Sequence, residues 1–165
     1  MPFRIVPLDS THDRSGFNSK VSALDNYFRQ QVTQDARRNV ARCFVALDSD
    51  ERVAGYYTLA SASVPLNDLP TDLIKKLPRY PSIPAVRMGR LAVDRHFQGQ
   101  RLGTGLLADA LKRTLRAEIA AYALLVDAKD EGAAAFYRHH AFAPLPQSPL
   151  TLLLPLAIAS KMLRE

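Results

Sequence analysis

One stretch, residues 90–111, restricts the fold of this chain more than any other. It reads RLAVDRHFQGQRLGTGLLADAL: an apolar run, a polar turn, a glycine loop and a segment rich in leucine and alanine. A strand followed by such a loop and a helix can bind an anion, because glycines let the backbone approach a ligand and the N–H groups of the first helical turn face outward. The helix dipole adds about half a positive charge there. Arg95 and Arg101 lie between Asp94 and Asp109, so the loop is electropositive and suited to an anion.

The glycines alone leave an ordinary strand-to-helix turn open as the alternative. The sequence contains neither G-x-x-x-x-G-K-[ST] nor a G-x-G-x-x-G within a repeating βαβ chain. Residues 100–105, QRLGTG, resemble the acetyl-CoA loop Q/R-x-x-G-x-G/A of the GCN5-related N-acetyltransferases. On the longer form of that loop, Q-G-x-G-x-G, the matching positions are Gln98, Gly99, Arg101 and Gly103, so Arg101 replaces a usual glycine.

The resemblance implies a set of residues that bind acetyl-CoA, the acyl donor. Two of them, Leu91 and Val93, are implied to bind the pantetheine arm and the acetyl carbonyl through backbone groups. The full set is Leu91, Val93, Gln98, Gly99, Gln100, Arg101, Leu102, Gly103, Thr104, Gly105 and Asp130.

Hydrophobic periodicity predicts a mixed sheet with helices on both faces. The strands are expected at 3–8, 41–47, 53–64, 86–93, 123–126, from 142 onward and at 150–156. The helices are expected at 22–38 with Ser22 as N-cap, briefly within 69–77, after the glycine loop, at 131–140 with Asp130 as N-cap, and at 157–163. Early hairpins followed by βαβ units argue against a doubly wound sheet. This α/β (α+β) order is similar to that of the acetyltransferases, which implies about six or seven strands, splayed between the fourth and fifth, in a single domain over 1–165.

A second motif lies downstream of the loop in the order that the family has. Residues 130–137, DEGAAAFY, resemble the family element N-x-x-A-x-x-F-Y, with Asp130 in place of the Asn and Ala141 in place of a later Gly. The resemblance places Tyr137 near the thioester sulfur, where a phenol with a pKa near 10 can donate a proton to the leaving thiolate. A buried aromatic pair with Phe136 is the alternative. The glycine loop upstream favours the catalytic interpretation.

Other reactive side chains carry no chemistry in this interpretation. His139 and His140 are adjacent on a helix, so they point in different directions and are expected at the surface. Cys43 lies in an apolar run and is expected in the core; a disulfide within the chain is excluded. No Cys/His cluster has metal-ligand spacing, so no metal is expected. No general base is visible, which leaves an ordered water or a backbone group to deprotonate the amine.

The positive net charge of the chain favours an anionic partner. The formal net charge is +6 over 165 residues, and the pI is near 9.7. A merely solvated basic surface is the alternative. The start of the chain shows no signal peptide, and the longest apolar stretch, 150–159, is too short to cross a bilayer. A cytoplasmic protein with no membrane contact is therefore expected.

A narrower resemblance covers nearly the whole chain. The acetyltransferase toxins of bacterial toxin–antitoxin pairs carry an F-x-C-G-x-x-x-L-D-x-Y/F-L opening and a Q-D-x-R-R stretch. Here Phe17 is followed by LDNYF at 24–28 and QDARR at 34–38, with Asn18 and Ser19 taken to stand in place of the Cys-Gly pair. Segments GYYTL at 55–59, MGRLAVD at 88–94 and DAKDE at 127–131 also fit.

This resemblance implies a function. Members transfer acetyl from acetyl-CoA to the α-amine of aminoacyl-tRNA, which blocks translation, and pair with a ribbon-helix-helix antitoxin. Basic residues gather at the end of the first long helix and near the glycine loop, and those assigned to tRNA are Arg37, Arg38, Arg42, Arg90 and Arg95. An acetyltransferase of protein N-termini or small amines and a non-catalytic CoA-binding module are the alternatives, although Tyr137 argues against the module. The tRNA species, the antitoxin's identity and a homodimer are left open.

Overall fold

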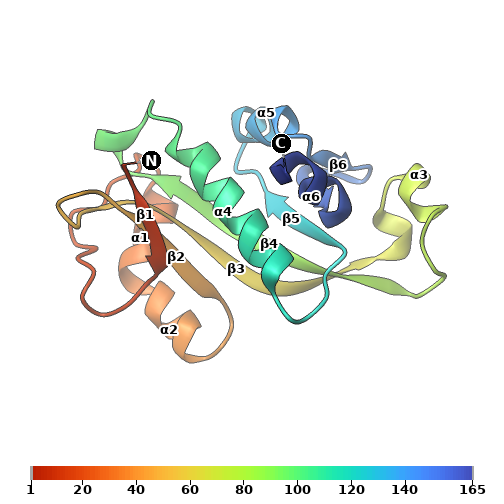
Figure 1. The fold of residues 1–165 in the computed structure, drawn as a ribbon, viewed down its shortest axis with the longest axis horizontal. Coiled ribbons are helices and arrows are strands. Elements are labelled where there is room, and N and C mark those ends of the chain that lie inside the picture. The colour runs from red at the N-terminus through yellow and green to blue at the C-terminus, as the bar shows by residue number, and fades with distance from the viewer. Residues whose placement is uncertain (1, 165) are drawn as a thin grey trace. The chain divides into compact units, whose positions relative to one another are not determined.

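The computed structural model describes residues 2–164 and contains a seven-stranded mixed sheet with helices (Figure 1). The strands are β1 (Arg4–Pro7), β2 (Arg42–Leu47), β3 (Val53–Pro65), β4 (Ser82–Val93), β5 (Ala123–Asp127), β6 (Ala143–Leu145) and β7 (Ser148–Pro155). The helices are α1 (Ser22–Gln30), α2 (Val32–Arg37), α3 (Thr71–Ile74), α4 (Leu102–Arg116), α5 (Glu131–His139) and α6 (Leu156–Arg164), with 3-10 turns η1 (Leu66–Asp68) and η2 (Arg95–Phe97).

The strand order is β1-β2-β3-β4-β5-β7-β6. Strands β1, β2 and β3 pair antiparallel, as do β5, β7 and β6, whereas β4 and β5 pair parallel. The parallel pairs join Ala85–Met88 to Ala123–Val126, and β4 continues beyond them to Val93. The α/β class and the mixed seven-stranded sheet expected from the sequence are confirmed.

The chain divides into two compact units. The first contains the residues up to Ala60 together with Gly89–Ala110, and the second contains Ser61–Met88 and the residues from Leu111 onward. Strands β3 and β4 and helix α4 therefore each contribute to both units. Each unit has a hydrophobic core of its own.

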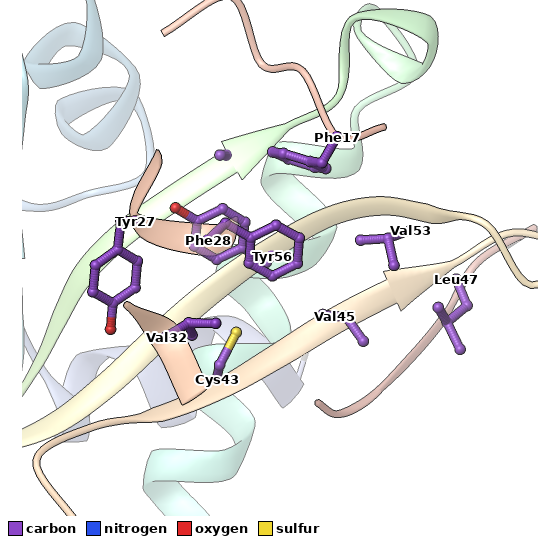
Figure 2. Packing of buried hydrophobic residues seen from close by; sticks show 10 residues of the cluster. Phe17, Tyr27, Phe28, Val32, Cys43, Val45, Leu47, Val53 and Tyr56 are labelled. Carbon is purple, nitrogen blue, oxygen red and sulfur yellow. The ribbon is translucent and has the colours of Figure 1, made fainter. Parts of the chain in front are cut away.

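The core of the first unit is built around three aromatic rings (Figure 2). Phe28 of α1 stacks on Tyr56 of β3 with 4.2 Å between ring centroids, and Phe17 packs edge-on against both at 4.9 and 5.6 Å. The Tyr56 hydroxyl donates to the Leu24 carbonyl oxygen at 2.7 Å, which satisfies the polar end of a buried side chain. These contacts hold α1 on the sheet.

The core of the second unit is aliphatic. Residues 123–126 of β5 are buried without alternation, as expected for a strand with neighbours on both sides and both faces covered. The core residues are Val64, Leu66, Leu69, Ile83, Ala85, Ala123, Leu125, Leu145 and Leu153.

Three predicted boundaries are wrong. The helix expected over 22–38 is two helices separated at Gln31, and its N-cap residue is Val21, without a side-chain cap, instead of Ser22. Strand β4 begins at Ser82, earlier than the expected residue 86, although it contains Pro84. Pro84 has no N–H to donate, but its carbonyl oxygen accepts from the Tyr122 N–H at 2.8 Å.

Three replaced family glycines adopt the left-handed backbone region that favours glycine. Arg101 has φ +63° and Ala141 has φ +75°. The spacing of the toxin opening, counted from Phe17, places its Cys-Gly pair at Ser19 and Lys20, which corrects the assignment to Asn18 and Ser19; Lys20 has φ +73°. The left-handed conformation costs a residue with a Cβ about 1–2 kcal/mol.

We expect Ala141→Gly to raise the free energy of unfolding by about 1 kcal/mol, because it relieves this strain at an exposed site that follows α5. Urea unfolding measures the change. The matched control is Ala143→Gly, exposed in β6, which should lose about 0.5–1 kcal/mol. Equal losses in both variants would contradict strain at Ala141.

Candidate active site

The glycine loop starts from a buried carboxylate in the first unit. Asp94 follows β4 and is only 4% exposed. Its Oδ2 accepts from the Asn18 N–H at 2.9 Å, and its Oδ1 accepts from the His96 N–H at 2.9 Å, which caps η2. Its own N–H donates to the Ala54 carbonyl oxygen at 2.8 Å. Asp94 thereby joins the N-terminal segment, β3 and the start of the loop.

Gln98 folds the loop back onto the strand. Its Nε2 donates to the Val93 carbonyl oxygen at 3.0 Å and to the Ser19 carbonyl oxygen at 3.2 Å. A carbonyl has two acceptor positions, so one of those on Val93, a residue assigned to pantetheine, is already in use. The structure gives the Gln98 side chain a bracing role within the protein.

Helix α4 begins earlier than the sequence analysis placed it. Gly103 and Gly105 lie within its first turn instead of in the preceding loop. The Gly105 N–H donates to the Arg101 carbonyl oxygen at 3.1 Å. The N–H groups of Leu102 and Gly103 precede this bond, so they have no acceptor within the described helix. With Gly99 at φ +83° and Arg101 exposed beside it, this helix end has the amides, the dipole and the charge that bind a phosphate.

Close packing fixes the first part of α4 on β3. A Cβ on Gly55 would lie 2.9 Å from the Ala92 carbonyl oxygen and 3.0 Å from Leu106 Cδ1, so only glycine fits there. The Tyr57 hydroxyl donates to Asp109 Oδ2 at 2.6 Å. Asp109 is half-buried and contacts the sheet through this bond.

Tyr137 lies in the second unit, on α5. Asp130 is the N-cap of this helix, as expected, and its side chain accepts from the Ala133 N–H at 2.8 Å. The Tyr137 ring is buried and packs edge-on against Phe136 and Phe142 with centroids 5.2 and 5.7 Å apart. Burial raises the pKa of Tyr137 above its ordinary value, and Asp127 adds to the shift.

The hydroxyl of Tyr137 differs from its ring. Within residues 2–164 the Tyr137 hydroxyl makes no hydrogen bond. Every side-chain oxygen that is fully buried in this part of the chain has a hydrogen-bond partner. The oxygen must therefore reach the surface, while the ring remains in the core. The aromatic packing and a proton donor role, which the sequence left as alternatives, are compatible in this geometry.

The arginines assigned to tRNA all belong to the first unit, but their environments differ. Arg42 donates to the Ala36 carbonyl oxygen at 2.9 Å and to Asn39 Oδ1 at 2.6 Å, so it ties down the end of α2. Arg37, Arg38 and Arg95 are exposed. Arg90 is half-buried, with its guanidinium carbon 3.5 Å from the Tyr27 ring centroid.

The burial of two acidic side chains was not predicted from the sequence. Asp25 of α1 is 5% exposed, and its carboxylate accepts from the Ser19 N–H at 3.0 Å and the Ser19 hydroxyl at 2.7 Å. Asp94 likewise accepts from a backbone N–H of the same segment, that of Asn18. Both aspartates lie within quoted motifs, so their place in LDNYF and MGRLAVD was the available signal.

The histidines are partly as expected. His139 is exposed, whereas His140 is half-buried against Phe136 with 4.9 Å between ring centroids. Burial lowers the pKa of His140, and His139 lowers it further.

Among residues 2–164, no three His, Cys, Asp or Glu side chains are grouped to hold a metal. The described helices also include none of sufficient length and apolarity to cross a membrane.

Comparison with known proteins gives consistent matches. The profile of the Acetyltransferase (GNAT) family matches residues 10–142. The tRNA-acetylating toxin of Mycobacterium tuberculosis (strain ATCC 25618 / H37Rv) is 39% identical over 155 residues, which cover 93% of this chain and 90% of the relative. The probable toxin TacT of Sinorhizobium fredii (strain NBRC 101917 / NGR234) is 30% identical over 164 residues, covering 93% and 91%.

Solved structures agree in fold over the full length. A tyrosine-to-phenylalanine mutant of KacT superposes with a TM-score of 0.90 at 27% identity, covering 98% of this chain and 99% of the other. AtaT complexed with acetyl-methionyl-tRNAfMet gives 0.86 at 29% identity, with the same coverage. A mutant AtaT bound to the C-terminus of the antitoxin AtaR and acetyl-CoA gives 0.81 at 26% identity, covering 100% of both chains.

We expect Asp94→Asn to lower the free energy of unfolding by about 1–3 kcal/mol, because the amide replaces one acceptor with a donor that faces a backbone N–H. Urea unfolding measures the loss. The control is Asp50→Asn, at an exposed turn, which should stay within about 0.5 kcal/mol of wild type. If both variants unfold at the same urea concentration, Asp94 does not hold the loop.

Proposed function

The chain belongs to the acetyltransferase (GNAT) family, and we propose that it is the toxin of a toxin–antitoxin pair. It transfers acetyl from acetyl-CoA to the α-amine of aminoacyl-tRNA and so blocks translation. One observation carries this proposal: 39% identity, over 93% of this chain, with a relative named tRNA-acetylating toxin. The AtaT structure with acetyl-methionyl-tRNAfMet supports it, because its TM-score of 0.86 extends over nearly the whole chain.

Acetyl-CoA is the acyl donor, and its proposed phosphate site is the N-terminal end of α4. The pyrophosphate accepts hydrogen bonds from the first amides of the helix, with the Arg101 guanidinium beside them. Gly99 and Arg101, both in the left-handed conformation, form the turn that directly precedes these amides. Structures of AtaT that contain acetyl-CoA support the choice of donor.

Tyr137 is the proposed proton donor. The amine attacks the thioester carbonyl, the carbon–sulfur bond breaks, and the thiolate takes the Tyr137 hydroxyl proton, while the attacking nitrogen releases one proton that restores the phenol. Tyr137 supports this role in two respects: its oxygen reaches the surface, and its raised pKa keeps the phenol protonated at neutral pH. The α-amine of an aminoacyl ester is less basic than a lysine amine, so more of it is already neutral and the need for a strong general base is smaller.

The proposed partners follow from the same relatives. An antitoxin binds AtaT in a solved structure that covers 100% of both chains, so we assign an antitoxin, of the ribbon-helix-helix class, to this chain as well. Because tRNA is charged and used in the cytoplasm, we propose that the protein acts there. We also propose that residues 1–165 form one acetyltransferase domain.

We expect labelled acetyl groups to pass from acetyl-CoA to charged tRNA but not to uncharged tRNA, because only the charged form has an α-amine. Scintillation counting of precipitated RNA measures the transfer, and an N-terminal peptide tests the alternative acceptor. Phosphate contacts make the rate fall with added salt, at about 0.7–0.9 log units per contact for each log unit of salt. Equal labelling of the peptide without salt dependence would favour an acetyltransferase of protein N-termini or small amines.

We expect Tyr137→Phe to lower kcat about a hundredfold or more while acetyl-CoA affinity changes little, because only the proton donor is lost. The pKa is raised, so the acid stays protonated as pH rises, and the wild-type kcat should show no alkaline loss from Tyr137 below about pH 9.5. Stopped-flow kinetics and calorimetry measure these values. Tyr122→Phe, which removes a half-buried hydroxyl elsewhere in the same unit, is the control. A nearly wild-type kcat in both variants would return Tyr137 to a packing role.

A further inference from the structure

Three residues from separate sequence motifs meet in the first unit. Tyr27 lies in LDNYF on α1, Asp35 in QDARR on α2, and Arg90 in MGRLAVD on β4. The Arg90 guanidinium carbon is 3.5 Å from the centroid of the Tyr27 ring. The Tyr27 hydroxyl donates to Asp35 Oδ2 at 2.7 Å. The phenol of Tyr27 therefore lies between the carboxylate of Asp35 and the guanidinium of Arg90.

The Arg90 guanidinium is held by its face, so its edges remain available. Within residues 2–164 it donates no hydrogen bond and forms no ion pair with a carboxylate. Other arginines of this unit are used differently: Arg14 donates to the Phe28 carbonyl oxygen at 2.7 Å and Arg29 to the Phe17 carbonyl oxygen at 2.6 Å. Those two serve the core, whereas a guanidinium fixed only by stacking keeps its fork of N–H donors for another group.

Tyr27 is fixed in place by both of its ends. Tyr27 is 8% exposed and belongs to the core cluster of Figure 2, where it lies at the edge with its hydroxyl directed away from Phe28. Burial and the bond to Asp35 raise the pKa of Tyr27, so the phenol keeps its proton. A neutral phenol that donates to a carboxylate gains electron density in its ring, which strengthens the attraction for a cation above its face.

Asp35 holds the Tyr27 ring in place without an ion pair to Arg90. Its pKa is lowered, first by the hydrogen bond from Tyr27 and then by that from Gln31, so it remains a carboxylate. Its other oxygen, Oδ1, accepts from Gln31 Nε2 at 3.1 Å. Each oxygen thus accepts one hydrogen bond from α1 or from the segment between α1 and α2. The carboxylate acts on Arg90 through the phenol and also by direct attraction between the two opposite charges.

We propose that Tyr27 and Asp35 are positioning residues that hold the Arg90 guanidinium ready to bind a backbone phosphate of the tRNA substrate. A guanidinium binds phosphate through two parallel N–H···O bonds, and restricting it beforehand reduces the entropy lost on binding. Arg37 and Arg38 are exposed at the end of α2, two and three residues after Asp35, and supply further positive charge. The inference rests on the proposed function for the identity of the polyanion.

The test measures the affinity of uncharged tRNA by fluorescence anisotropy over a range of salt concentrations. We expect Arg90→Ala to weaken binding about tenfold and to reduce the salt slope by about 0.7–0.9, the contribution of one phosphate. Arg90→Lys should keep the slope, because the charge remains, but lose part of the affinity, because the fork and the stack are lost. The control is Arg4→Ala, an exposed arginine of the same unit paired with Glu51, which should leave both values unchanged.

Double mutants separate positioning from packing. Tyr27→Phe and Asp35→Asn keep the core volume and should each weaken tRNA binding about two- to fivefold. In an Arg90→Ala background, both should have no further effect, because the residue that they position is gone. A purely structural role predicts lower thermal stability with additive or absent effects on tRNA affinity. Additive effects, unchanged tRNA affinity in Tyr27→Phe and Asp35→Asn, or an unchanged salt slope in Arg90→Ala overturn the inference.

The two proposals fail in different ways. If the wild-type protein binds tRNA with the expected salt slope but labels no charged tRNA, the proposed reaction is wrong while the variants still test Arg90. If labelling succeeds and Arg90→Ala keeps the wild-type KM for charged tRNA and salt slope, the positioning proposal is wrong while the function stands. A wild-type protein without salt-dependent affinity for tRNA overturns the positioning proposal.

Discussion

The buried carboxylate of Asp94 is the interaction on which the first unit depends. Removing a carboxylate from water is costly unless hydrogen bonds replace the solvent, and two backbone N–H groups do so here, from Asn18 and His96. One side chain thereby sets the exit of β4, the start of the loop and the path of the N-terminal segment. The N-terminal end of α4 follows this loop in the chain, so Asp94 also helps to position it.

Left-handed backbone occurs at three positions where the family motifs have glycine. Lys20, Arg101 and Ala141 have φ between +63° and +75°, although each carries a Cβ. The surrounding hydrogen bonds compensate for the strain: for example, the Ala141 N–H donates to the Arg138 carbonyl oxygen at 3.0 Å. At residue 101 the exchange adds a positive charge beside the amides of α4, which favours an anion at the helix end.

The basic charge of the chain is divided between structural and available arginines. Arg14, Arg29 and Arg42 spend their donors on backbone carbonyls and belong to the architecture of the first unit. Arg90 is fixed by an aromatic face and keeps its donors. Net charge therefore overstates the surface offered to a polyanion, since a guanidinium that already donates to the protein has less to give to a phosphate.

The sequence by itself determined the local features: the α/β order, the helix after the glycine loop, the Asp130 cap and the apolar β5, because each depends on neighbours a few residues away. It also identified the family through motifs with fixed spacing. It could not show that Gln31 ends α1, that Pro84 lies within β4, or that Asp109 bonds to Tyr57, because these depend on partners distant in the chain. The meeting of Tyr27, Asp35 and Arg90 was likewise decided by tertiary structure, since it requires packing α1 and α2 on β4.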